Sequence, residues 1–234
     1  GAGLAGLLTA YRLKEKGIEA VVLEADTVGS GQSKNTTAKI TAQHGLLYDT
    51  LIKDFGREKA GQYAAANQTA VDEYRTLIAD KHIDCDYGEL PSFVYSTFDS
   101  EILKKEAAAA QALGLPADFT QRLSLPFPTA GAVRFSEQAQ FHPLKFLNSL
   151  AEDLTVYEHT PILTVKENCL YTENYRIDAK HIVFATHYPF VNFPGFYFMR
   201  MHQERSYLLA LENAPDVVKL AVDLIMLLES HDIA

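Results

Sequence analysis

Three glycines and one carboxylate near the start of the chain have the types and spacing needed to bind a dinucleotide. Gly1, Gly3 and Gly6 form a Gly-x-Gly-x-x-Gly pattern, and Glu24 follows about 20 residues later. In this pattern the glycines allow a tight turn, a close approach of backbone to a pyrophosphate, and close packing of a helix on a sheet. The helix N-terminus offers N–H groups to phosphates, and the carboxylate accepts hydrogen bonds from a ribose. The alternative is an ordinary turn followed by a solvated glutamate.

A helix and a strand must place the glycine turn and the carboxylate next to each other. Apolar residues recur with a helical period from Leu4 to Lys16, and Gly17 is suited to end that helix. The apolar run from Ala20 to Leu23 predicts a parallel strand covered on both faces. A buried strand normally precedes the glycine turn, and the chain begins on the glycine, so we expect a fragment that lacks this strand.

A polar stretch of small residues, TVGSGQSKNTTAKITAQHG, follows from Thr27 to Gly45. Its hydroxyls and backbone N–H groups suit a loop that wraps a polar ligand. An exposed flexible linker is the alternative, but it would not need apolar anchors such as Val28, Ile40 and Leu46. The stretch therefore favours a ligand-binding loop.

Composition limits the classes of protein that the chain can belong to. It has 234 residues, is 47% hydrophobic and carries a net charge of −9, which predicts a packed globular protein with no nucleic-acid partner. No apolar run approaches the roughly 18 residues of a membrane helix, so we predict no membrane span and a soluble, cytoplasmic protein. Cys85 and Cys169 lack the spacing of metal ligands and the eight histidines are scattered, so we predict reduced thiols and no metal.

Further periodic segments predict the remaining elements. Helices are expected over residues 47–81, with a break at Gly56, and over 100–113 and 143–153, the last beginning with Pro143. Strands are expected over 89–97 and 132–135, with an irregular stretch over 115–131.

The last third of the chain predicts a different architecture. Short strands within residues 155–178 indicate a small antiparallel meander, followed by a strand over 181–186 that ends at Ala185 and Thr186. An aromatic, extended stretch from 190 to 212 predicts strands of a larger sheet. Residues 215–233 predict an acidic amphipathic helix.

Five stretches in this order resemble the D-amino-acid-oxidase-like (DAO) family of FAD-dependent amine oxidoreductases. They are GAGLAG with VVLEAD, GSGQSKNTTAKITAQHGL, FHPLKFLNSLA, VYEHTPILTV, and IVFATHYPF with HQERSYLLAL. The segment Thr36–Lys39 resembles the branch in which a Rieske iron–sulfur domain often follows the flavoprotein part. The resemblance covers roughly residues 1–213, and the tail after Pro215 and the absence of Rieske ligand pairs depart from it.

The resemblance implies an α/β fold, in which a Rossmann-like FAD domain is interleaved with a substrate domain built on an antiparallel sheet. The FAD domain would comprise residues 1–86 and 137–189. Residues 87–136 and 190–214 would form part of the substrate domain, and 215–234 an atypical helical tail.

The resemblance also places residues at the cofactor, FAD. The glycines would face the pyrophosphate and Glu24 the adenosine ribose. Ser30, Gly31 and residues 35–38 would line the pyrophosphate and flavin, and the backbone of Ile162 would face the adenine. The complete set is Gly1, Gly3, Gly6, Glu24, Ser30, Gly31, Asn35, Thr36, Thr37, Ala38, Ile162, Ala185 and Thr186. His187 stands where the family has a glycine, so we expect that turn to be altered and not to take the glycine conformation.

The implied reaction passes a hydride to the flavin from the carbon that bears the amine of a small-molecule amine or amino acid. The electron acceptor is not specified. Arg205 and, more weakly, Arg134 could bind a substrate carboxylate, and Tyr207 could line the same pocket, although structural roles explain all three. His44 and His187 are candidate general bases, with a hydrogen-bonded structural histidine as the alternative.

Two other interpretations stay open. The chain could be a non-catalytic remnant or flavin-binding fragment of such an enzyme, in keeping with an N-terminal portion that binds FAD weakly or not at all. It could also be an NAD-binding Rossmann protein, although compact NAD domains usually have no long polar loop after the acidic residue.

Overall fold

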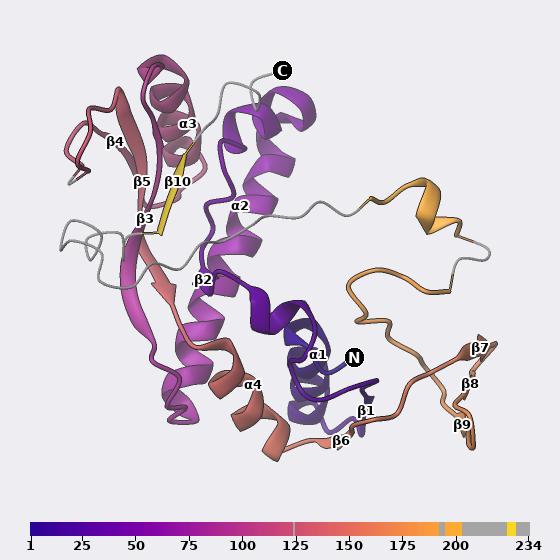
Figure 1. The fold of residues 1–234 in the computed structure, drawn as a ribbon. Coiled ribbons are helices and arrows are strands. Elements are labelled where there is room, and N and C mark those ends of the chain that lie inside the picture. The colour runs from indigo at the N-terminus through magenta and orange to yellow at the C-terminus, as the bar shows by residue number, and fades with distance from the viewer. Residues whose placement is uncertain (124, 192–194, 203–223, 228–234) are drawn as a thin grey trace. The chain divides into compact units, whose positions relative to one another are not determined.

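A computed structural model of the chain describes residues 1–123, 125–191, 195–202 and 224–227. It divides into two compact units (Figure 1). The glycine-turn unit comprises Gly1–Thr37, Ile83–Cys85 and His142–Leu209, and the sheet unit comprises Ala38–His82, Asp86–Phe141 and Ala210–Ala234. The predicted FAD and substrate domains have other boundaries, since residues 38–82 group here with the central sheet. That functional division stays a prediction.

The glycine-turn unit is built on one helix followed by one strand, as predicted, but the strand is not covered on both faces, because Val21 is exposed. Helix α1 spans Leu4–Glu15, and Gly17 ends it with a left-handed φ of +71°. Strand β1, Val21–Leu23, pairs in parallel with β6, Thr155–Tyr157. Such a parallel pair needs a crossover connection, and much of the chain lies between its two strands.

Helix α4, Pro143–Glu152, contacts α1 and leads directly into β6. It has Pro143 in its first turn, where the missing N–H costs nothing, and the His142 ring accepts a hydrogen bond from the Lys145 backbone N–H. Its apolar residues Phe146, Leu147 and Leu150 are fully buried. The Lys14 ammonium of α1 donates to the Asp153 carbonyl at its C-terminal end.

The predicted meander is confirmed as a three-stranded antiparallel sheet. Its strands are β7, Thr164–Lys166, β8, Cys169–Tyr171, and β9, Arg176–Asp178. The strand predicted over 181–186 is wrong, because these residues pair with no strand in the described part of the chain. A short 3₁₀ helix, η2, Tyr197–Met199, lies where extended strands were expected, and residues 203–212 of that stretch are outside the described part of the chain.

The sheet unit has β5, Gly131–Gln140, as its central strand. Strand β3, Gly88–Ser96, pairs with one edge of β5, and β2, Lys39–Ile40, and β4, Ala117–Thr120, also pair with it, all antiparallel. Helices α2, Tyr48–Asp80, and α3, Ser100–Ala112, lie beside this sheet (Figure 1). The predicted break in the long helix is confirmed at Gly56, where φ is +80°.

Three predictions for the sheet unit need correction. The stretch 115–131 contains β4, and β5 extends well beyond the predicted 132–135 because its neighbours supply pairing on both edges. The predicted helix over 215–233 is wrong at the four residues described there, since Leu224–Leu227 form strand β10, parallel to β3.

Among the described residues, no helix is long and apolar enough to cross a membrane.

Candidate functional site

The glycine turn of the glycine-turn unit is closed by contacts that leave no room for side chains. A Cβ on Gly6 would lie 1.8 Å from the Gly1 carbonyl oxygen, and a Cβ on Gly1 would lie 2.4 Å from the Ala185 oxygen. Both neighbours are backbone atoms, which cannot move aside as a flexible side chain could. The packing therefore requires glycine at these two positions.

Glu24 follows the end of β1 and contacts the glycine turn directly. Its Oε2 accepts a hydrogen bond of 2.5 Å from the Ala2 backbone N–H, and its Oε1 accepts one of 3.1 Å from that of Asp26. The side chain is half-buried, so the carboxylate stays accessible. A carboxylate in this position can share its lone pairs with the hydroxyls of a ribose.

Ser33 is a site residue that the sequence analysis missed. It lies in the short 3₁₀ helix η1, Gln32–Asn35, and its hydroxyl oxygen accepts a 3.0 Å hydrogen bond from the Leu4 N–H in the first turn of α1. A Cβ on Gly3 would lie 2.8 Å from the same oxygen. The signal was weak, because Ser33 is one of several small polar residues in the loop and only the fold selects it.

The loop after β1 is fixed at its start and exposed further along. The Gly29 N–H donates to the Ala2 carbonyl at 3.0 Å, and the Ser30 N–H donates to the Thr27 carbonyl at 3.0 Å. Gly31 and the residues Asn35, Thr36 and Thr37 are exposed. The structure thus brings Gly29 to the glycine turn, directly before Ser30 and Gly31 in the chain.

Ala38, the last residue predicted for this loop, belongs to the sheet unit. Its carbonyl accepts a hydrogen bond from the Phe141 N–H, and its φ is +60°. The predicted cofactor residues are therefore divided between the two units.

Ala185 lies at the glycine turn, and Thr186 follows it in the chain. The Ala185 carbonyl is the atom that a Cβ on Gly1 would meet, and its Cβ lies 3.4 Å from the ideal Cβ position of Gly6. His187 has a φ of +58°, so the expectation that it would not take the glycine conformation is wrong. The Tyr188 N–H donates to the Thr186 carbonyl across it and closes the turn at a strained residue. Ile162 is half-buried in the connection between β6 and β7.

His44 lies in the sheet unit, on a loop held by buried polar side chains. Its Nε2 is 3.3 Å from the Asn67 Oδ1 of α2, and the side chain is exposed. Next to it, the buried Gln43 amide donates to the Val133 carbonyl at 3.0 Å and accepts a hydrogen bond from Ser92. The loop backbone is further fixed by Gln138, whose Oε1 accepts from the Ala42 N–H at 2.6 Å. The exposed imidazole is thus attached to a backbone that buried side chains hold in place.

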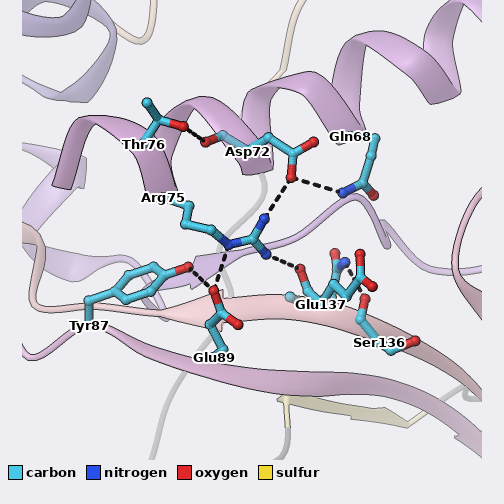
Figure 2. Close-up of polar contacts among 9 residues, drawn as sticks. Gln68, Asp72, Arg75, Thr76, Tyr87, Glu89, Ser136 and Glu137 are labelled. Atoms are coloured by element: carbon cyan, nitrogen blue, oxygen red, sulfur yellow. Dashed lines mark hydrogen bonds and ion pairs between the residues drawn. The ribbon is translucent and has the colours of Figure 1, made fainter. Parts of the chain in front are cut away.

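A β-bulge sets the direction of Gln138. The β3–β5 register shifts between Leu90 and Ser92, and Glu137 has a φ of +61°. Figure 2 shows the Arg75 guanidinium in contact with the Glu137 carbonyl, at 3.3 Å, and with the carboxylates of Asp72, at 2.8 Å, and Glu89, at 2.6 Å. Arg75 therefore ties helix α2 to the bulge, and a bulge re-aims the side chain that follows it.

Arg134 is paired and therefore a poor candidate for a substrate carboxylate. Its Nε and Nη2 both lie 2.8 Å from the Asp118 Oδ1, across the β4–β5 ladder at the protein surface. Arg205 and Tyr207 lie outside the described residues.

Glu106 of α3 is a buried carboxylate with a structural role. It accepts hydrogen bonds from the N–H groups of Leu47 and Tyr48, both 2.8 Å long, and of Asp49, at 2.9 Å. These groups are at the start of α2, where helix N–H groups lack partners within the helix. Burial raises the pKa of Glu106, and the three N–H groups oppose that rise. Glu106 thus serves as the cap of another helix.

The described residues offer no group of three or more histidine, cysteine, aspartate or glutamate side chains arranged to hold a metal ion. Cys85 is buried and Cys169 half-buried, and neither forms a disulfide. The Cys169 thiol donates to Asp178 on the neighbouring strand.

The residues around the glycine turn fit the adenosine diphosphate part of FAD. Backbone N–H groups at the start of α1 and hydroxyls from Ser30 and Ser33 can bind phosphates, and the Glu24 carboxylate can bind ribose. An added Cβ at Gly31 would meet nothing within 4 Å, so this backbone has open space beside it.

Comparisons with known proteins agree with this geometry. The protein-family model described as FAD dependent oxidoreductase (DAO) matches residues 1–231. This match includes most of the tail that the sequence analysis placed outside the resemblance. A Bacillus subtilis protein named as a Rieske 2Fe-2S iron–sulfur protein, YhfW, is 33% identical over 95% of this chain and 47% of its own length.

Two further proteins are similar to the chain, one in part of its sequence and one in fold. Gamma-glutamylputrescine oxidoreductase of Escherichia coli is 31% identical over 37% of this chain and 20% of its own length. The structure of glycine oxidase from Geobacillus kaustophilus superimposes with a TM-score of 0.59 at 20% identity, and covers 76% of this chain and 51% of its own. The chain thus spans about half the length, or less, of the relatives that it matches. The resemblance drawn from the sequence, the fold class and FAD as cofactor are confirmed.

Proposed function

Because this chain belongs to the FAD-dependent oxidoreductase family (DAO), we propose that it forms the cofactor-binding part of an enzyme that oxidises an amine or amino acid. The names of two similar proteins support this substrate class, since one acts on gamma-glutamylputrescine and the other on glycine. The cytoplasmic location predicted from the sequence stays a prediction.

The observation that carries the proposal is the convergence of Glu24 and Ser33 on the glycine turn. Glu24 approaches the turn from β1 and Ser33 approaches the first turn of α1, with hydrogen bonds of 2.5 and 3.0 Å. Together they surround the backbone that receives the pyrophosphate in dinucleotide-binding folds. A solvated glutamate after an ordinary turn would not make these contacts.

When bound, FAD supplies the acceptor for a hydride from the carbon that bears the amine, and the protein supplies binding and orientation. In this proposal the α1 N-terminus and Ser33 would hold the pyrophosphate, and Glu24 would hold the adenosine ribose. Residues 35–38 would line the pyrophosphate and flavin, and the backbone of Ile162 would contact the adenine. Ala185, whose carbonyl lies against Gly1, and Thr186 would approach FAD.

His44 and His187 are the proposed acid–base candidates among the described residues. His44 has an exposed ring that contacts Asn67, which could fix its tautomer. A neutral imidazole there could accept the ammonium proton of a substrate before oxidation.

The test is anaerobic reduction of the bound flavin by candidate substrates. The product of the complete reading frame is reconstituted with FAD and mixed with glycine, proline, putrescine or gamma-glutamylputrescine, and the flavin absorbance is followed. Bleaching by at least one amine is expected. A protein that binds FAD but is reduced by no amine would favour a non-catalytic flavoprotein, and tight NAD binding without flavin affinity would favour the NAD-binding alternative.

A further inference from the structure

We propose that Glu158 is a positioning residue of the cofactor site. Its carboxylate, which follows the end of β6, holds the backbone turn that presents Ser30 and Gly31 to the pyrophosphate. This inference rests on the proposed function, because Ser30 and Gly31 contact the cofactor only under that proposal.

Backbone hydrogen bonds continue the β1–β6 pairing beyond the ends of the two strands. The Glu24 N–H donates to the Tyr157 carbonyl at 2.9 Å, and the Thr160 N–H donates to the Glu24 carbonyl at 2.7 Å. The His159 N–H then donates to the Asp26 carbonyl at 2.9 Å. The segment after β6 therefore runs alongside the loop after β1 as far as Asp26.

The Glu158 side chain continues this contact to the next part of the loop. Its Oε1 accepts a hydrogen bond of 2.6 Å from the Val28 backbone N–H, although the two residues are 130 positions apart in sequence. The side chain is exposed, so solvent screens its charge and the contact depends on the acceptor oxygen. Glu158 thus fixes a backbone atom that lies two residues before Ser30.

The other side of the same turn is anchored to the glycine turn and to α4. The Gly29 N–H donates to the Ala2 carbonyl, and Gly29 has a φ of +70°. A Cβ on Gly29 would lie 2.7 Å from the Leu144 Cδ2, so the turn is packed on α4 as well. With Val28 held by Glu158 and Gly29 held by Ala2, the direction of Ser30 is determined from both sides.

The contact needs only one acceptor oxygen facing the Val28 N–H. Glutamine offers the same carbonyl oxygen, so Glu158→Gln should keep the turn in place, whereas Glu158→Ala removes the acceptor. Glu173 is an exposed glutamate in the turn between β8 and β9 of the same unit, and Glu173→Ala is the matched control.

The first measurement is amide hydrogen exchange of residues 26–31, followed by mass spectrometry or NMR. We expect exchange at Val28 to be at least about fivefold faster in Glu158→Ala than in wild type, the factor that corresponds to about 1 kcal/mol. Glu158→Gln and Glu173→Ala should exchange as wild type does. Equal exchange at Val28 in Glu158→Ala and wild type would overturn the proposal.

The second measurement is FAD affinity of the product of the complete reading frame, by flavin fluorescence. We expect Glu158→Ala to raise the dissociation constant about fivefold with an unchanged unfolding temperature, and Glu158→Gln to restore affinity. Faster exchange without any loss of affinity, or a loss explained by a lowered unfolding temperature, would also overturn the positioning role.

Glu24→Ala separates this inference from the proposed function. If Glu24→Ala weakens FAD binding and Glu158→Ala does not, only the role of Glu158 is overturned. If wild type does not bind FAD, or if Glu24→Ala binds FAD as tightly as wild type does, the proposed cofactor site itself is wrong. The role of Glu158 is then overturned with it.

Discussion

In the glycine-turn unit, the half-buried side chains of Glu24 and Ser33 bond to backbone N–H groups beside an exposed loop. In the sheet unit, the side chains of Glu106 and Gln138 are themselves buried and bond to the buried N–H groups of Tyr48 and Ala42. Both units thus place side-chain oxygens on backbone N–H groups. They differ in whether water or a ligand can reach those oxygens.

Exposure distinguishes a group that can exchange partners from one that cannot. A buried oxygen such as Glu106 Oε1 has exchanged water for protein donors, and removal of that oxygen leaves buried N–H groups without partners. A half-buried oxygen such as the Ser33 hydroxyl can bond to water when a phosphate takes the Leu4 N–H, so neither group is left without a partner. Hydrogen-bond counts alone would not separate the two roles.

The strongest test of the comparison is Gly6→Ala in the glycine-turn unit. The new Cβ would lie 1.8 Å from the Gly1 carbonyl oxygen, so the turn must open and α1 must shift. We expect FAD affinity to fall by at least about 100-fold, which corresponds to about 2.8 kcal/mol. Fluorescence titration measures it.

The control is Gly61→Ala in helix α2, where the nearest atom outside the helix lies 4.0 Å from the added Cβ. Alanine is the better helix former, so this variant should bind FAD normally and be more stable by up to about 1 kcal/mol. Normal FAD affinity in Gly6→Ala would contradict the requirement for a closed turn.

The sheet unit is tested next by Glu106→Ala, which leaves three N–H groups at the start of α2 without their acceptor. We expect the free energy of unfolding to fall by about 3 kcal/mol, because these groups are buried or half-buried. Urea unfolding measures the loss. The exposed Glu101→Ala on the same helix should change stability by less than about 1 kcal/mol, and an equally small change for Glu106→Ala would refute the capping role.

A smaller effect is expected from pH. Since burial raises the pKa of Glu106 above its usual 4.5, the folded state binds its proton more tightly than the unfolded state does. The resulting stability is present in full below 4.5 and is lost as pH rises through the raised pKa. Wild type should therefore lose stability relative to Glu106→Gln over this window, as urea unfolding at several pH values would show. A constant difference between the two proteins would contradict the shift.

The smallest effect is expected from Arg134→Ala, which breaks an exposed ion pair with Asp118. Stability should change by less than about 1 kcal/mol, and the KM for any amino-acid substrate should stay as in wild type. Steady-state kinetics and thermal unfolding measure both. A KM raised tenfold or more would instead place Arg134 at the substrate carboxylate.

Much of the local structure could be predicted because its signals lie within a few residues of the feature. The period of α1, the left-handed Gly17, the kink at Gly56 and the Pro143 start of α4 all follow from local backbone preferences. The spacing of the glycines and Glu24 likewise predicted which residues meet at the turn, and the Ala2 to Glu24 hydrogen bond agrees.

Features that depend on distant partners could not be predicted in this way. Strand β4 and the full length of β5 form because neighbouring strands satisfy their backbone groups, although residues 115–131 look irregular. The strand predicted over 181–186 lacks such a partner among the described residues. Ser33 and Glu158 were missed because each acts on a backbone N–H from far away in the sequence.

The sequence by itself determined the dinucleotide turn, its helix and strand, and the family to which they belong, because glycine spacing and hydrophobic period act over short distances. Only the tertiary structure decided that Ala185 closes against Gly1, that His187 takes a left-handed conformation, and that Glu106 caps a helix from another element. These features arise when segments far apart in the chain pack together, since the space left and the unpaired N–H groups exist only after folding.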